Sequence, residues 1–157
     1  MIENFNPNDV ALSTNNIFGL PSTVENSKLI IIPVPWEVTV SYRNGTARAP
    51  EEILEASRQI DLYDVNAHNM WQHGYHMLPI DAEWVKRNDY LRHCAELIIA
   101  DLSEGGATSN NEQLCNKLDE INKGGTEIAT WIYEQAKRYI SQGKLVALLG
   151  GDHSTPL

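Results

Sequence analysis

Two unbroken apolar runs constrain the fold more than any other feature of this 157-residue chain. The first, in "KLIIIPVPW", has five apolar residues in the six positions Leu29–Val34, and the second, "KLVALLGG", occupies Lys144–Gly151. Apolar runs without polar alternation are typical of strands that are buried on both faces, as in a parallel sheet. Pro33 and Pro35 lack the backbone donor that a ladder needs, so we expect them to close the first strand.

Three stretches between these runs carry helical patterns. Residues 50–60, "PEEILEASRQI", begin with a proline and two glutamates, which suit the first turn of a helix. Residues 82–104 place four apolar side chains on one stripe: Leu91, Ala95, Ile98 and Leu102. Residues 112–142 continue the helical pattern, and Gly124 and Gly125 predict either a break there or two separate helices.

The segment between the first two predicted helices contains a weaker strand signal. Residues 60–65, "IDLYDV", are predicted to form a strand, and residues 66–80 a loop or a short edge segment. Strands that alternate with helices predict an α/β fold with helices on both faces of the sheet. We find no repeat and no internal boundary, so residues 29–157 are expected to form one α/β portion. Residues 1–28, rich in Asn, Ser, Thr and Pro, precede it as an irregular N-terminal arm.

Composition excludes several classes of protein. The net charge of −9 disfavours a nucleic-acid partner, because no cluster of Lys or Arg offsets it. Neither a signal peptide nor an apolar stretch long enough to span a bilayer is evident, so we expect a cytoplasmic protein without a membrane partner. Cys94 and Cys115 both fall in helical patterns, and we interpret them as small apolar side chains.

The second apolar run leads directly into the turn "GGDHS", Gly150–Ser154. Binding sites in open α/β sheets form beyond the carboxyl ends of the strands, where this turn is expected. The glycines permit a tight backbone, Asp152 and His153 would project into the crevice, and Ser154 could cap the next helix. The residues alone leave two interpretations open: a metal or catalytic site, or a capped turn with an incidental histidine.

Two motifs resemble the ureohydrolase family of arginases, agmatinases, guanidinobutyrases and formimidoylglutamases. "LLGGDHS", Leu148–Ser154, is similar to the first metal-binding signature of that family. "VPWEVTVSYRNGTARAPEEILEAS", Val34–Ser57, resembles the agmatinase segment that precedes this signature by about a hundred residues. Ala49-Pro50 and Asn44-Gly45 stand where relatives often have Gly-Pro and Pro-Gly. The two motifs occur in the order of the family, and the resemblance covers nearly the whole chain.

The resemblance implies a three-layer α/β/α fold on a mainly parallel sheet, incomplete in this chain. It also implies a hydrolase that uses two Mn²⁺ ions to cleave a guanidinium or formimidoyl C–N bond, releasing urea or formamide from a small cationic, guanidino or formimidoyl substrate. By the resemblance His153 is a metal ligand, whereas the other residues of the signature have supporting or structural roles: Asp152, Gly150, Gly151 and Ser154. The second motif would supply a substrate-entrance loop containing Trp36, Tyr42, Arg43 and Asn44.

The later metal-binding stretches of the family, Asp-Ala-His-x-Asp and Asp-x-Asp, do not occur in this sequence. A single histidine cannot hold two divalent ions, so we expect this chain alone to be inactive. Our first hypothesis is that the chain is the N-terminal part of an agmatinase-like ureohydrolase that forms homo-oligomers. The alternative is a truncated, non-catalytic protein that acts only through association with itself or a partner.

Other candidate groups are weaker. The stretch "HNMWQHGYH" contains three histidines, His68, His73 and His76. No acidic or cysteine partner for a metal site is close to them in sequence. Asp61 and Asp64 stand at positions i and i+3, a spacing that places them on opposite faces of a strand. We interpret both groups as structural or surface residues. Arg43 could bind a substrate carboxylate or form a surface or subunit ion pair, and the second role is favoured.

Overall fold

The computed structural model describes residues 2, 5–7, 9, 16–40 and 42–155. Three parallel strands form its sheet in the order β2-β1-β3. Strand β1 spans Leu29–Val34, β2 spans Tyr75–Met77 and β3 spans Leu145–Gly150. The α/β class predicted from the alternation of elements is confirmed, and the sheet is parallel throughout.

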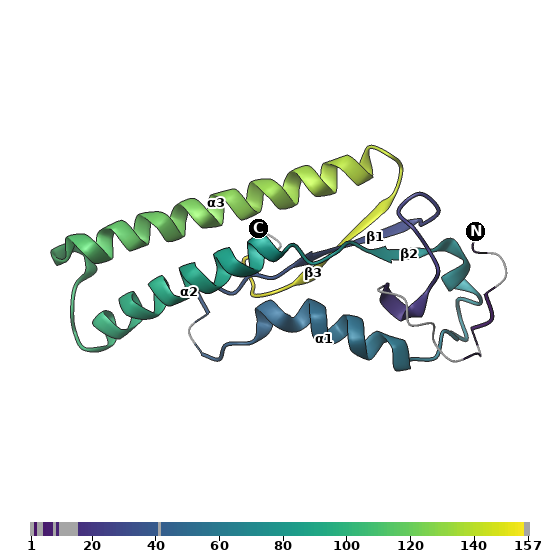
Figure 1. Ribbon diagram of the computed structural model, residues 1–157, viewed down its shortest axis with the longest axis horizontal. Coiled ribbons are helices and arrows are strands. Elements are labelled where there is room, and N and C mark those ends of the chain that lie inside the picture. Colours follow the sequence, from purple (N-terminus) through teal and green to yellow (C-terminus); the bar gives the residue numbers. More distant parts are fainter. Residues whose placement is uncertain (1, 3–4, 8, 10–15, 41, 156–157) are drawn as a thin grey trace.

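Helices cover both faces of the sheet (Figure 1). Helix α1, Ala49–Ala56, lies on one face, while α2, Ala82–Ser103, and α3, Glu112–Ile140, pack together on the other. Asp81 accepts from the N–H of Glu83 at the start of α2, and Asn111 plays the same capping role for α3. Short 3₁₀ turns fill the connections: Ile17–Gly19, Thr46–Arg48, Ser57–Gln59, Met70–His73 and Thr108–Asn110. Within the described residues, no helix has both the length and the apolar character needed to cross a bilayer.

The central strand is the most buried element of the sheet. Five of the six residues of β1 are buried, as its apolar run predicted. Pro33 lies inside β1, opposite Leu149, and not at its end as expected. Strand β2 pairs only with Leu29–Ile31, so at Pro33 the strand β1 is paired on one side only, with β3.

The strand predicted at residues 60–65 is wrong. This segment is irregular, and Ile60, Tyr63 and Val65 are exposed. The Asp64 carboxylate accepts from the N–H groups of Asn66 and Ala67, a local turn that competes with strand pairing. The edge of β1 is taken instead by β2, which lies inside the segment predicted to be a loop or an edge.

The break predicted at Gly124 and Gly125 is also wrong, because α3 is continuous. A Cβ atom on Gly124 would lie 2.3 Å from Cδ1 of Leu91 and 3.4 Å from the ring of Trp36. The glycine therefore lets α3 approach α2 and the end of β1 closely. Propensity argues for a break at two glycines, but here tertiary packing overrides it.

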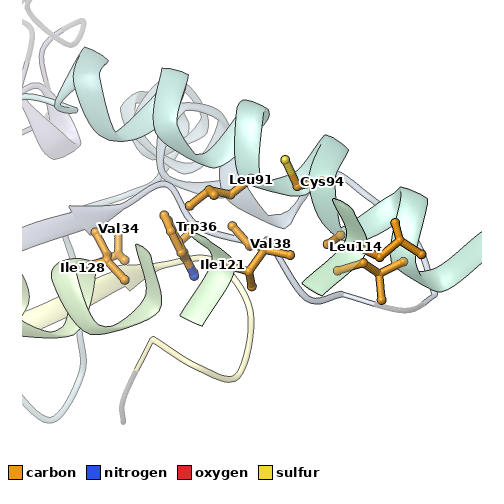
Figure 2. Packing of buried hydrophobic residues seen from close by; sticks show 10 residues of the cluster. Val34, Trp36, Val38, Leu91, Cys94, Leu114, Ile121 and Ile128 are labelled. Carbon is orange, nitrogen blue, oxygen red and sulfur yellow. The ribbon is translucent and has the colours of Figure 1, made fainter. Parts of the chain in front are cut away.

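The largest apolar cluster lies between β1, α2 and α3 (Figure 2). Its buried members come from the end of β1, the segment that follows it and the facing sides of the two helices: Val34, Trp36, Val38, Leu91, Cys94, Ala95, Ile98, Leu114, Ile121 and Ile128. Cys94 is fully buried, as expected, and Cys115 is half-buried. This cluster fixes the carboxyl end of β1, where the candidate site begins.

Candidate functional site

The Gly150-Gly151 turn is pressed against the carboxyl end of β1. A Cβ atom on Gly150 would lie 2.4 Å from the carbonyl oxygen of Val34, and one on Gly151 would lie 2.0 Å from that of Trp36. No side chain fits at these separations. Close backbone approach is therefore the reason for both glycines.

Asp152 organises the turn from within. Its backbone N–H donates to the carbonyl oxygen of Trp36 at 3.0 Å, which ties the turn to the segment after β1. Its carboxylate accepts from both the N–H, at 2.9 Å, and the hydroxyl of Ser154. Thr155 N–H then donates to the Asp152 carbonyl at 3.1 Å. His153 lies between Asp152 and Ser154, with its side chain exposed, beyond the carboxyl ends of β1 and β3.

The donor groups around this turn do not make a complete metal site. Among the residues that the structure describes, no three His, Cys, Asp or Glu side chains gather as they would around a metal ion. Two bridged divalent ions need several carboxylate and imidazole ligands. The described side chains therefore do not fit a two-metal site on their own, although the imidazole of His153 is of a suitable ligand type.

A cavity of about 650 Å³ adjoins the turn. Its walls come from the carboxyl end of β1 and the residues after it, from one side of α3, and from Leu148, Ser154 and Thr155. Thr155 is buried, and its hydroxyl has no hydrogen-bond partner in the described part of the chain. Sequence reasoning placed no role on Thr155, whose only signal is its position directly after the motif.

Trp36 is both a core residue and part of the cavity wall. It is 4% exposed, and its ring meets that of Trp84 edge-on at a centroid distance of 6.0 Å. Figure 2 shows the ring among Leu91, Val38 and Ile121. The expectation that Trp36 could line the crevice agrees with its place in the cavity wall, but most of its surface is buried in the core.

The other residues expected at the substrate entrance lie on the loop between β1 and α1. Tyr42 is 86% exposed, and the guanidinium of Arg43 lies 5.3 Å from the centre of its ring. Asn44 bonds to Arg92 and Glu96 of α2. These three residues are not among those that line the cavity, and Ser41, which precedes them in the motif, lies outside the described residues.

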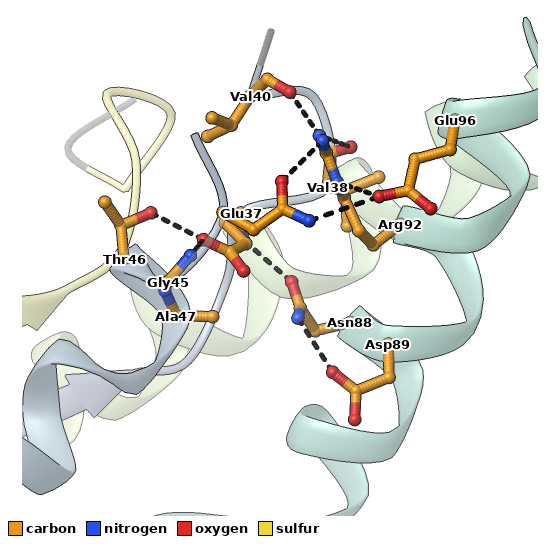
Figure 3. A network of polar contacts seen from close by, with 11 residues as sticks. Glu37, Val38, Val40, Gly45, Thr46, Ala47, Asn88, Asp89, Arg92 and Glu96 are labelled. Carbon is orange, nitrogen blue, oxygen red and sulfur yellow. Dashed lines mark hydrogen bonds and ion pairs between the residues drawn. The ribbon is translucent and has the colours of Figure 1, made fainter. Parts of the chain in front are cut away.

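Sequence reasoning missed Glu37, the charged residue most deeply embedded near the site (Figure 3). One oxygen of its buried carboxylate accepts from Gly45 N–H at 2.7 Å, from the hydroxyl of Thr46 at 3.0 Å and from Ala47 N–H at 3.3 Å. Burial acts to raise the pKa of Glu37, but these hydrogen bonds together outweigh it and lower the pKa. The available signal was a lone acid directly after an apolar run, since buried charges require partners.

The weaker candidates form no site. His76 lies in β2, where its Nδ1 is 3.0 Å from the carbonyl oxygen of Ser22, while His68 and His73 are exposed. Asp61 is also exposed, and Asp64 caps the local turn described above. The described residues bring none of these groups into a metal-binding cluster.

Comparison with known proteins tests the resemblance directly. The sequence model of the arginase family matches residues 27–157. The chain belongs to the arginase family. Three curated relatives carry the name N(1)-aminopropylagmatine ureohydrolase. No solved structure gives a significant match.

The relatives of the arginase-family chain differ in how much they share with it. A protein from one strain of Thermus thermophilus is 27% identical over 141 residues, which is 88% of this chain and 35% of the relative. Its counterpart from a second strain of the same species is 25% identical over 132 residues, or 83% of this chain and 32% of the relative. A Synechocystis protein is 44% identical over 39 residues, 25% of this chain and 13% of the relative. The chain thus spans about a third of the length of the two Thermus relatives.

Proposed function

We propose that the chain forms the N-terminal part of a ureohydrolase that cleaves a guanidinium or formimidoyl C–N bond and releases urea or formamide. The observation that carries the proposal is the Gly-Gly-Asp-His-Ser turn at the carboxyl end of β3, in a chain that the arginase family matches over residues 27–157. The names of the relatives suggest an aminopropylagmatine-like guanidino substrate, which is cationic. A net charge of −9 suits such a substrate electrostatically.

Within this proposal His153 is one ligand of a manganese pair. Such a pair would supply a hydroxide nucleophile at neutral pH. The role of this chain is to place the imidazole: Gly150 and Gly151 bring the turn onto β1, and Asp152 holds its shape. The remaining ligands belong to polypeptide that is not in this sequence, so we propose that the chain alone is inactive.

The first test uses the chain itself. Paramagnetic Mn²⁺ added to ¹⁵N-labelled protein should broaden the amide signals around His153 first. His153→Ala should abolish this effect, whereas His73→Ala, a change at an exposed histidine away from the turn, should leave it intact. Equal broadening in the His153→Ala protein would show that the ligand assignment is wrong.

The second test supplies the missing polypeptide. A chimera would carry residues 27–157 in place of the matching segment of the T. thermophilus relative that is 27% identical to this chain. We expect it to bind manganese and to release urea from aminopropylagmatine, agmatine, arginine or guanidinobutyrate, and we expect His153→Ala to lower metal content and turnover together. A folded chimera that retains its metal after this change would contradict the proposal, as would urea release by the 157-residue chain alone.

A second candidate function is association without catalysis. The observation in its favour is the outer side of β3, where no described residue adds a further strand and Leu145 is 61% exposed. Open strand edges with apolar side chains pair readily with other chains. A stable, stoichiometric self-assembly of the purified chain, with no turnover in the chimera, would favour this alternative.

A further inference from the structure

The loop that joins β1 to α1 is held from two sides by charged side chains (Figure 3). On one side is the Glu37 carboxylate, which accepts three hydrogen bonds from Gly45, Thr46 and Ala47. Because Glu37 lies near the start of the loop and these residues lie near its end, the carboxylate closes the loop on itself. Glu37 N–H also donates to the side-chain oxygen of Asn88, a buried residue of α2, at 2.7 Å.

On the other side is Arg92 of α2. Its guanidinium donates to the carbonyl oxygens of Val38 and Val40 and, at 2.8 Å, to the side-chain oxygen of Asn44. Glu96, one turn further along α2, pairs with Arg92 at 3.2 Å and accepts from the Asn44 amide at 3.2 Å. The Arg92 side chain is only 13% exposed and its bonds to Val38 and Val40 are partly buried, whereas its bonds to Asn44 and Glu96 lie at the surface.

The contacts of Glu37 and of Arg92 leave the middle of the loop exposed to solvent. Tyr42 and Arg43 stack on each other between the points held by Arg92, and both are exposed. A short loop with both ends fixed loses little further conformational entropy when something binds to it. Fixing the chain on either side of Tyr42 and Arg43, at Val40 and Asn44, therefore lowers the entropic cost of binding at these two side chains.

We infer that Glu37 and Arg92 are positioning residues that hold the Tyr42–Asn44 segment in one shape before any ligand arrives. The loop contacts the site side of the sheet, since the 3₁₀ turn Thr46–Arg48 packs against β3. That the displayed segment meets the substrate of the hydrolase rests on the proposed function. The rigidity of the segment does not depend on the proposed function.

The rigidity is tested on the 157-residue chain by ¹⁵N relaxation. In the wild type, the amides of Tyr42–Asn44 should have order parameters of about 0.85, as in a rigid backbone, and in Glu37→Gln and Arg92→Lys they should fall below about 0.6. Lysine keeps the charge but loses the fork of donors. Arg87→Lys is the matched control, because Arg87 lies on the same helix but pairs with Glu127 at 3.1 Å, away from the loop.

Arg92→Lys leaves the buried carboxylate in place, so it tests the idea even if Glu37→Gln does not fold. Order parameters at wild-type values in a folded Arg92→Lys protein would overturn the inference. The substrate part is read in the chimera, where Arg92→Lys should raise KM several-fold more than it lowers kcat, whereas Arg87→Lys should change neither. A loosened loop with an unchanged KM would overturn the role at the entrance, and a chimera without any turnover would count against the hydrolase and not against the rigid loop.

Discussion

The two outer edges of the sheet satisfy their backbone hydrogen bonds in different ways. At the β2 edge, Asn16 takes the place of a neighbouring strand: its side chain accepts from Met77 N–H and donates to the Tyr75 carbonyl, each at 3.0 Å. The Ser22 hydroxyl also donates to Tyr75, and the Ser22 carbonyl meets His76. At the β3 edge, no described residue adds a strand.

The residues at the two edges of the sheet also differ in how deeply they are buried. Asn16 and Ser22 are buried, as are Ile17 and Leu20 beside them. Strand β3, which the sequence predicted to be as buried as β1, is half-exposed along its length, so that prediction is wrong. An apolar run indicates that both faces of a strand favour burial. Whether those faces are covered depends on the elements that are available to pack on them. The β2 side is therefore a finished edge, whereas the described residues leave the β3 side uncovered.

The largest effect should come from opening the finished edge. Asn16→Ala removes the side chain that bonds Leu20, Tyr75 and Met77, leaving buried backbone groups without partners. We expect the free energy of unfolding in urea to fall by about 3 kcal/mol. Asn26→Ala is the control, because it removes one exposed bond to Thr23 and should have a much smaller effect. Equal losses in the two variants would show that Asn16 does not seal the edge.

Two adjacent glycines sharpen the comparison inside α3. Gly124→Ala should lower the free energy of unfolding by about 1–2 kcal/mol, because its methyl group would crowd the fully buried Leu91. Gly125 faces the cavity beside β3, with nothing within 4 Å of an added Cβ. Gly125→Ala should therefore stabilise the protein by about 0.5–1 kcal/mol. Chemical denaturation of both variants measures the difference, and the same sign for both would contradict it.

Lowering the pH should weaken the contacts of the β1–α1 loop before it affects the β2 edge of the sheet. The pKa of Glu37 is lowered in the folded protein, so the carboxylate stabilises the loop above the ordinary pKa of a glutamate. This contribution is lost as the pH falls through the lowered pKa. The bonds of Asn16 involve no titratable side chain. Hydrogen exchange followed from about pH 6 downward should show protection lost at Gly45 and Ala47 first, and Glu37→Gln should remove that pH dependence.

The smallest effect on stability should come from the open edge itself. Leu145→Lys changes a side chain that is 61% exposed, so the free energy of unfolding should move by no more than about 0.5 kcal/mol. A lysine on an edge strand opposes pairing with another chain. Sedimentation velocity should therefore show less self-association than in the wild type, with Leu118→Lys, on the exposed side of α3, as the control. Unchanged association would place the interface elsewhere.

Several elements follow from local pattern alone. The run Leu29–Val34 specified β1, the stripe through Leu91 and Ala95 specified α2, and the "GGDHS" motif located a turn at a strand end. Together with the segment Val34–Ser57, that motif resembled the ureohydrolase family, and the match to the arginase family confirms the resemblance. The metal role of His153 and the entrance role of Tyr42, Arg43 and Asn44 stay predictions.

The remainder was decided by contacts between residues far apart in the chain. Asn16 bonds the edge of β2 across 59 residues, and Asn88 meets Glu37 across 51. Gly124 looks like a helix breaker until Leu91 is seen opposite it. Periodicity records which face of a segment is apolar, so strands and helices can be predicted from sequence. Which segment takes an edge, and which polar group meets a buried charge, depends on how the elements pack, and only the tertiary structure decides that.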